Sequence, residues 1–120
     1  VQDHLHVLQA DFANPDPDED DPVVRPSHTA QLEEWIDGFD GELEPLTHFV
    51  LPSGSEAGAK LHHARTVARR AERRAVDLAD DEPVNAEAVA YLNRLSDALF
   101  TFARVVNARD GVPEDAPDYE

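Results

Sequence analysis

The sequence has no cysteine and no long apolar run. Without cysteine the chain can form no disulfide, no thiolate metal site and no cysteine nucleophile. A helix that spans a bilayer needs roughly 18 consecutive apolar residues, and no run here approaches that length. No signal peptide is visible either. We therefore expect a cytoplasmic protein without a membrane partner.

Positive charge is also scarce, because 10 Lys and Arg residues face 26 Asp and Glu residues, for a formal net charge of -16. Such a chain repels polyanions, which argues against binding to nucleic acid or to an anionic membrane. An acidic disordered chain would explain the charge, but 41% hydrophobic residues and clear helical periodicity argue against disorder. We favour a halophilic protein, whose surface carboxylates keep it solvated in high salt.

The 120 residues are enough for one domain with a modest core. Apolar residues recur at helical spacing in four segments, and no segment reads as a strand. The expected helices cover residues 1–13, 28–44, about 53–81 and 86–108. Ser27, Ser53 and Asn85 are the expected N-caps, Ser53 because Glu56 follows at capping-box spacing. The sequence thus predicts an all-α, up-and-down helical bundle.

The connections between the expected helices are either short or rich in proline. Residues 14–26 contain four prolines, which excludes a regular helix there. A short turn joins the last two helices, so these two must pack antiparallel. We expect one domain over residues 1–109, followed by an acidic, disordered tail over residues 110–120.

The two longest helices have apolar faces that predict the core. Alanine dominates the face of the 53–81 helix, so a neighbouring helix can approach it closely. Trp35, in the helix before, is expected to anchor the core and not to stack on a ligand. The expected core positions of the 53–81 helix are Leu61, Ala64, Ala68, Ala71, Ala75 and Leu78. Those of the last helix are Val89, Leu92, Leu95, Ser96, Leu99, Phe102, Ala103 and Val106.

Three apparent motifs fail on spacing. The acidic run that begins at Asp16 resembles a calcium loop, but its sixth position is Asp21 in place of Gly, and its twelfth is Ser27 in place of Glu. Residues 54–60 lack the spacing of a Walker A loop and follow no strand. The six histidines include no pair with metal-ligand spacing, so we expect surface histidines and no metal site.

Half of the positive charge is concentrated in one short run, which we name the arginine cluster. It consists of Arg65, Arg69, Arg70, Arg73 and Arg74, all within ten residues. Neighbouring cations repel one another, so such a run needs an explanation. Guanidinium groups bind phosphate through bidentate hydrogen bonds. The cluster therefore favours an anionic ligand.

Helical spacing divides the arginine cluster. Arg65 and Arg69 share one helix face with Glu72, while the other arginines point to adjacent or opposite sides. Asn93 and Asp97 are four residues apart on the last helix and can lie beside that face once the two helices pack antiparallel. Interhelical salt bridges are one explanation of this polar seam. An anionic ligand is the other, since one Glu and one Asp cannot neutralise five arginines.

Three blocks of the sequence resemble the ATP:cob(I)alamin adenosyltransferases of the propanediol-utilisation type. They are FVLPSG at 49–54, LHHARTVARRAERR at 61–74 and YLNRLSDALF at 91–100, and their order and spacing match that family. The resemblance implies a five-helix bundle that forms a homotrimer with active sites between subunits. It also implies transfer of the 5′-deoxyadenosyl group of ATP to cob(I)alamin, assisted by Mg2+, which yields adenosylcobalamin and triphosphate.

The resemblance assigns ATP-binding roles residue by residue. Arg69, Glu72 and Asn93 match family positions that bind ATP. Arg70 and Arg73 lie in the same nucleotide-binding run. These residue types suit the chemistry, because arginines stabilise the negative charge that develops on a triphosphate leaving group.

Further roles come from the same resemblance. Phe49 matches an aromatic residue that closes the lower face of the corrin, and we group it with Arg69 as catalytic. By excluding water and the axial base, Phe49 would leave a four-coordinate cobalt that is easier to reduce. Arg65 matches an arginine that pairs with an aspartate of the neighbouring subunit. Asp97 matches an acidic position that supports the arginines.

The sequence departs from the family pattern at its start. The chain begins at Val1 inside an expected helix, and the threonine- and glycine-rich segment that wraps the ATP phosphates is absent, so we expect an N-terminally incomplete chain that binds ATP poorly. Ser53 also stands where glycine is common. The alternatives to an enzyme are a helical-bundle module that binds or delivers a corrinoid, and a plain structural bundle. A corrinoid reductase or an adenosylcobalamin-dependent enzyme is the expected further partner.

Overall fold

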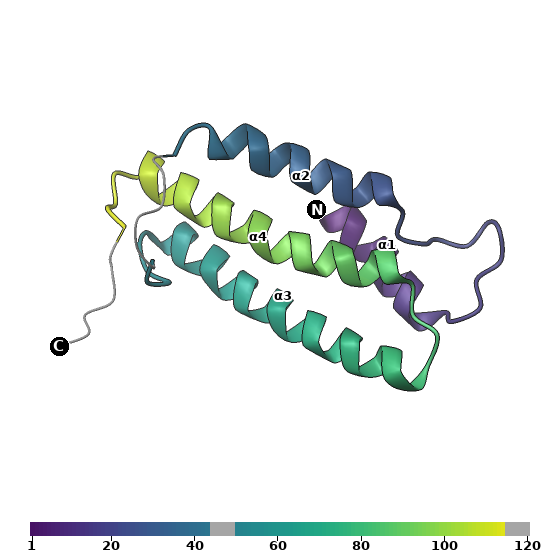
Figure 1. Ribbon diagram of the computed structural model, residues 1–120. Coiled ribbons are helices and arrows are strands. Elements are labelled where there is room, and N and C mark those ends of the chain that lie inside the picture. Colours follow the sequence, from purple (N-terminus) through teal and green to yellow (C-terminus); the bar gives the residue numbers. More distant parts are fainter. Residues whose placement is uncertain (44–49, 115–120) are drawn as a thin grey trace.

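The structure is a computed structural model that describes residues 1–43 and 50–114. Four helices follow one another along the chain: α1 (Gln2–Ala13), α2 (Pro26–Asp40), α3 (Glu56–Asp81) and α4 (Ala86–Arg109). No strand occurs among the residues described. In Figure 1, α2, α3 and α4 run alongside one another with α4 in the middle. The predicted all-α fold is confirmed.

The central helix of the bundle is α4. It packs against α2 on one side and α3 on the other, and α1 contacts it as well. A helix with neighbours on several sides is buried over most of its circumference, and α4 contributes more buried residues than any other element. α3 has 26 residues, about 39 Å at 1.5 Å per residue. Residues 82–85 join it to α4, so the two helices pack antiparallel as predicted.

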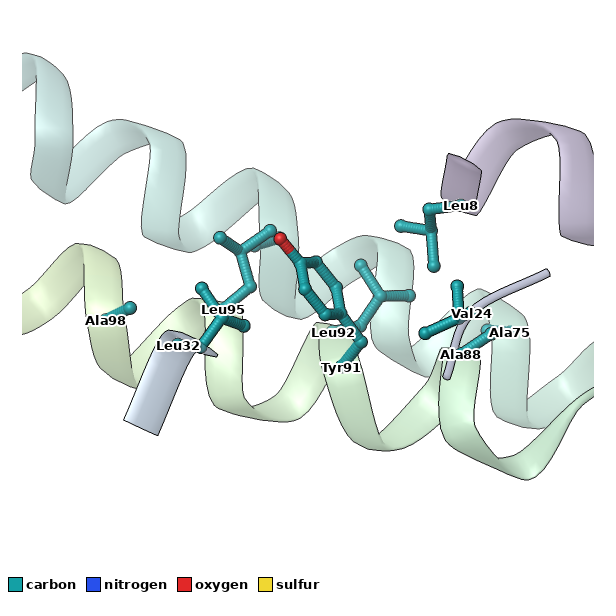
Figure 2. Close-up of a cluster of buried hydrophobic side chains, with 10 residues drawn as sticks. Leu8, Val24, Leu32, Ala75, Ala88, Tyr91, Leu92, Leu95 and Ala98 are labelled. Carbon is teal, nitrogen blue, oxygen red and sulfur yellow. The ribbon is translucent and has the colours of Figure 1, made fainter. Parts of the chain in front are cut away.

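The core forms where α1, α2 and α4 converge. Tyr91 and Leu32 are its largest fully buried side chains. Leu8, Leu92 and Leu95 belong to the same cluster, and Figure 2 shows Leu92 beside Tyr91, with Leu8 further along toward Val24. α3 contributes the small side chains Ala68 and Ala75 to the core, which permits the close approach of α3 and α4 that the alanine-rich face predicted. Trp35 packs partly buried against this cluster, in agreement with its predicted role.

Part of the core predicted for α3 is exposed, and the prediction was wrong there. Ala71 is exposed, Leu78 is 37% exposed, and the neighbouring Val67 is 41% exposed. These side chains line an apolar groove between α1 and α3, with Leu92 of α4 also in its lining. The prediction assumed a packing partner along the whole apolar face, but α1 packs on α4 and leaves this part of α3 uncovered.

The N-cap of α4 is as predicted. Asn85 accepts a hydrogen bond through its side chain from the Glu87 N–H at 3.0 Å. Its Nδ2 donates to Asp11 Oδ2 and to the Val24 carbonyl, both at 2.8 Å. The Val24 N–H in turn donates to Asp11 Oδ2 at 2.7 Å. Asp11 is only 6% exposed, so this hydrogen-bonded group ties the end of α1 and the following loop to the start of α4.

The other two predicted N-caps are wrong. α2 begins at Pro26 with Arg25 as its N-cap, so Ser27 lies inside the helix, because proline is favoured at the first helical position. α2 ends at Asp40, earlier than predicted. At the start of α3 the cap is Ser55, whose Oγ accepts from the Gly58 N–H at 3.2 Å; Ser53 lies two residues outside the helix.

The expectation of surface histidines is wrong for His4. This side chain is half-buried, and its Nδ1 lies 3.0 Å from the Tyr91 hydroxyl. Its ring stacks on Trp35 at 5.8 Å and meets His28 edge-on at 4.9 Å between centroids. α1 turns His4 toward Trp35 and Tyr91, where its hydrogen bond satisfies the buried hydroxyl of Tyr91.

The predicted end of the domain remains a prediction. α4 ends at Arg109, and the residues described continue to Glu114, whose carboxylate pairs with Arg104. Residues 115–120 of the predicted tail lie outside the described part. Within that part, no helix is both long and apolar enough to cross a membrane.

Candidate functional site

The arginine cluster occupies the middle of α3. Arg69, Arg70, Arg73 and Arg74 are exposed, and Arg65 is half-buried. Across residues 1–43 and 50–114, none of the salt bridges involves any of these five side chains. The explanation by interhelical salt bridges therefore gains no support from the described residues. Five guanidinium groups without an ion-pair partner there are available to an anion.

The antiparallel packing of α3 and α4 brings Glu72 and Asn93 together. Asn93 Nδ2 donates to Glu72 Oε2 at 3.0 Å. This bond crosses between the two helices at the exposed edge of the seam. It holds the Glu72 carboxylate beside the arginine cluster, three residues from Arg69 and one from Arg73.

Asp97 lies in the same seam, but its ion pair is with Arg94. Arg94 Nη1 donates to Asp97 Oδ2 at 2.7 Å, and Arg94 Nε lies 3.4 Å from Glu33 Oε1 on α2. The sequence reasoning missed Arg94. Its spacing of three residues from Asp97 on one helix was the available signal. Part of the negative charge expected to face the cluster is thus taken up within α4.

Arg65 turns inward toward α4. Its guanidinium carbon lies 4.8 Å from the centre of the Phe100 ring, a cation–π geometry. Its Nε is buried and has no hydrogen-bond partner among the described residues. Burial lowers the pKa of Arg65, the neighbouring Arg69 lowers it further, and Asp97 opposes the shift. An acidic group within reach of Arg65 and Arg69 would raise the pKa of Arg65 and so offset the lowering by burial and by Arg69.

His62 is buried beside Phe100 and close to Arg65, which contradicts its expected place on the surface. It is only 3% exposed, its ring lies 5.9 Å from the Phe100 ring, and its Nε2 has no partner in the described part of the chain. Burial lowers the pKa of His62, and Arg65 adds to the shift while Glu114 opposes it. The sequence reasoning missed both His62 and Phe100. The signal for His62 was its position three residues before Arg65.

Two predicted features of the site receive no test from these contacts: the role of Phe49 and the expectation that the protein has no metal site. Phe49 lies in the segment 44–49, outside the described residues. Among the described residues, no group of three or more His, Asp or Glu side chains could hold a metal ion.

A family model described as cobalamin adenosyltransferase matches residues 1–106 of the chain. The corrinoid adenosyltransferase MMAB of Bos taurus is 50% identical over 84 residues, which cover 70% of this chain and 35% of that relative. The corrinoid adenosyltransferase of Bacillus subtilis is 51% identical over 81 residues, 68% of this chain and 42% of its own length. This chain therefore spans less than half of these two relatives.

Solved structures agree with the match. A variant of the PduO-type ATP:corrinoid adenosyltransferase from Lactobacillus reuteri, complexed with cobalamin and ATP, superposes with a TM-score of 0.90 at 33% identity. The match covers 98% of this chain and 64% of that one. A second variant of that enzyme, complexed with ATP, has a TM-score of 0.88 at 34% identity, with 98% and 66% coverage. The chain belongs to the cobalamin adenosyltransferase family.

Proposed function

We propose that the protein transfers the 5′-deoxyadenosyl group of ATP to cob(I)alamin and releases triphosphate. The observation that carries this proposal is the arginine cluster on α3, which has no ion-pair partner among the described residues and lies beside the Glu72–Asn93 hydrogen bond. The relatives are named corrinoid adenosyltransferases, and of the two solved relatives one carries ATP and cobalamin and the other ATP.

In this proposal ATP binds along the exposed face of α3. Arg69, Arg70 and Arg73 bind the triphosphate, since exposed guanidinium groups donate forked hydrogen bonds to phosphate oxygens. Glu72 and Asn93 form the neighbouring polar edge and bind the nucleoside, because a carboxylate and an amide can pair with hydroxyl and amino groups. The 3.0 Å bond between them would hold that edge in place before ATP arrives.

The proposed reaction needs no general base. The cobalt(I) electron pair forms the new bond to carbon 5′ of the ribose, and the bond from that carbon to the phosphate oxygen breaks. The triphosphate leaves with the electrons of the broken bond, and the cobalt becomes formally Co(III). Arg69 and its neighbours stabilise the charge that develops on the leaving oxygen, so their contribution is largest in the transition state.

The corrinoid side of the reaction is assigned to Phe49. An aromatic side chain beneath the ring would exclude water and the lower axial base from cobalt. Cobalt without that ligand is easier to reduce from Co(II) to Co(I). The reducing electron would come from a corrinoid reductase, and an adenosylcobalamin-dependent enzyme would take the product.

Arg65 and Asp97 are proposed to complete the site at a subunit boundary in a homotrimer. The buried Nε of Arg65 has no partner among the described residues, which supports a carboxylate supplied by a neighbouring subunit. Asp97 is held by Arg94 at 2.7 Å and keeps some negative charge near Arg65.

Mg2+ is proposed to enter as part of the substrate. The described residues include no set of ligands that could hold a metal ion by themselves. Mg2+ would instead be bound by the phosphates of ATP and would lower their charge. No step of the proposed reaction depends on a metal site of the protein.

The setting we propose is the cytoplasm of a halophile. The support is compositional, since a formal net charge of -16 keeps a protein solvated where salt screens its self-repulsion. Activity and stability should both rise with salt if this is correct.

The decisive experiment follows the corrin spectrum. The protein, expressed with any sequence that its gene encodes before Val1 and after Glu120, is mixed with ATP, Mg2+ and chemically reduced cobalamin in high salt. Formation of a light-sensitive adenosylcobalamin, with stoichiometric triphosphate, is the expected result. An unchanged spectrum with tight corrinoid binding would overturn the enzyme and favour a module for corrinoid binding or delivery.

A further inference from the structure

The Phe100 ring lies in the seam between α3 and α4, among two arginines and a histidine. The guanidinium carbon of Arg65 lies 4.8 Å from the centre of this ring, and that of Arg104 lies 6.0 Å from it. The His62 ring lies 5.9 Å away, tilted by 59°. An aromatic face attracts cations, so Phe100 can hold a guanidinium without any polar atom in its own side chain.

Arg65 depends on this ring for its position. Within residues 1–43 and 50–114 the Arg65 side chain forms no hydrogen bond and no salt bridge, so the contact with Phe100 is what fixes its guanidinium there. Of its three guanidinium nitrogens, only Nε is buried without a partner in this part of the chain, so the two terminal nitrogens stay accessible. A free arginine side chain samples many rotamers, and holding it in one of them favours a partner that must meet it in one geometry.

The Phe100 ring has its own support on α4. Arg104 follows Phe100 by four residues, so the two side chains are neighbours on one face of the helix. Arg104 is only 6% exposed, and its Nε and Nη2 donate to the two carboxylate oxygens of Glu114. A buried side chain anchored in this way restricts the rotamers of its neighbour, which keeps the Phe100 ring against α3.

We propose that Phe100 is a positioning residue for Arg65 in the adenosyl transfer. By holding the guanidinium beside its ring, Phe100 keeps the terminal nitrogens of Arg65 in place for the carboxylate that a neighbouring subunit is proposed to supply. Arg69 lies one turn further along the same face of α3, so a displaced Arg65 would also disturb the proposed triphosphate site. This inference rests on the proposed function and adds a residue to which the resemblance assigned no role.

The first test removes the ring and measures the kinetics with ATP. Phe100→Leu should lower kcat/KM for ATP by about 3- to 30-fold, the range that the loss of one cation–π contact produces. Phe100→Tyr keeps an aromatic face and should retain most of the activity. If Phe100→Leu folds poorly, Phe100→Met fills the same space with a flexible side chain and should show the same loss. Full activity of the variants without a ring would overturn the inference.

The matched control is Phe102→Leu, the same substitution two residues further along α4. The Phe102 ring is also half-buried, but it meets the Phe39 ring of α2 edge-on at 5.6 Å. Phe102→Leu therefore removes an aromatic side chain of the bundle without removing the contact with Arg65, and kcat/KM for ATP should be unchanged. A loss in Phe102→Leu as large as that in Phe100→Leu would mean that both rings serve only the packing of the bundle, and would overturn the inference.

The second test asks whether the loss acts through Arg65. In an Arg65→Met background, which keeps an apolar stem but no charge, Phe100→Leu should cost much less than it does in the wild-type chain. The two single variants should also divide their losses between kcat and KM in the same way. Additive effects would overturn the inference. So would a raised KM for cob(I)alamin in Phe100→Leu that Arg65→Met does not share, because the ring would then act on the corrin.

A third measurement follows the contact without turnover. In NMR spectra the Arg65 Nε–H should be shifted by the ring current of Phe100 and should exchange slowly, because the nitrogen is buried. Phe100→Leu should remove both features and Phe102→Leu should keep them; an unshifted, rapidly exchanging signal in the wild-type protein would overturn the contact. If the wild-type protein forms no adenosylcobalamin, the proposed function fails. If it does and Phe100→Leu is fully active, only this inference fails.

Discussion

At the N-terminal end of α3, Asn107 has partners for both ends of its buried amide, whereas about three turns further along, Arg65 buries an Nε that has none in the described part. Both side chains lie between α3 and α4. Asn107 ties a connector to a helix, and the Asp11 carboxylate does the same at the other end of the bundle, with bonds to Val24 and Asn85.

The difference distinguishes polar side chains that stabilise this bundle from those that form a binding site. A buried polar group without a partner costs about 1–3 kcal/mol, so a fold retains it only where something else compensates. Asn107 and Asp11 are satisfied within the chain and stabilise its packing. Arg65 and His62 each bury a nitrogen without a partner in the described part of the chain, and the exposed arginines have no ion pair there, which is the pattern of a site completed by a ligand or by another subunit. The following predictions test this division.

The largest effect is expected at Asp11. Asp11→Ala would leave the Val24 N–H and the Asn85 amide without their acceptor in a site only 6% exposed. We expect the free energy of unfolding to fall by about 2–4 kcal/mol, measured by chemical denaturation. Asp11→Asn, which keeps an acceptor oxygen, should lose less. A change below 0.5 kcal/mol (roughly the size of a neutral surface substitution) would mean that these bonds do not stabilise the fold.

Arg69→Ala should lower ATP affinity and leave stability nearly unchanged, the opposite of what is expected for Asp11→Ala. Arg69 is exposed and has no ion pair with any described residue, so unfolding should be nearly unchanged. ATP affinity, measured by calorimetry, should fall roughly 10- to 150-fold, the value of a charged hydrogen bond of about 1.5–3 kcal/mol. Arg109→Ala is the control, because Arg109 is exposed but paired with Glu42 at 2.7 Å. If Arg69→Ala unfolds the protein instead, the cluster is structural.

Asn93→Ala is expected to have a smaller effect of the same kind. Asn93 is exposed and donates one hydrogen bond to Glu72, so the fold should change by no more than about 0.5 kcal/mol. ATP affinity should fall about 3- to 10-fold, in line with one neutral hydrogen bond. Asn93→Asp places a second carboxylate against Glu72 and should weaken ATP binding further. Tighter ATP binding by Asn93→Asp would contradict the proposed role.

The smallest expected effect is a loss of stability at acid pH. The pKa of His4 is lowered from 6.5 by burial and then by His28, with Asp3 opposing. The pKa of His62 is lowered by burial and Arg65, with Glu114 opposing. The unfolded chain therefore takes up these protons first, so the contribution to stability is complete above pH 6.5 and declines below it. Burial raises the pKa of Tyr91, the partner of His4, to about 12, so it stays neutral throughout.

The measurement is the thermal midpoint at pH 7.5 and at pH 5.5. His4→Asn removes one of the two titrating groups and should reduce the difference between these midpoints. An equal or larger difference in His4→Asn would show that His4 does not contribute. His6→Asn, at an exposed position on α1, is the matched control.

The sequence predicted most of the bundle because its signals are local. Four helices, the Asn85 cap and the antiparallel pair follow from periodicity and from a short turn, each contained within a few residues. The caps at Ser27 and Ser53 were wrong for reasons that are partly non-local. Pro26 can start a helix by itself. By contrast, the N-cap at Ser55 in place of Ser53 agrees with the hydrogen bonds that Ser55 makes to Asn107, which is 52 residues further along the chain.

By itself, the sequence determined the helices, the concentration of positive charge on one stretch of α3 and the family to which the blocks point. These depend on residue type and spacing along one helix. Only the tertiary structure decided which polar groups meet across helices: that Glu72 on α3 bonds Asn93 on α4, and that Arg65 and His62 turn inward against Phe100. The physical reason is that burial and hydrogen bonding depend on what a neighbouring helix presents, and spacing within one helix carries no record of its neighbour.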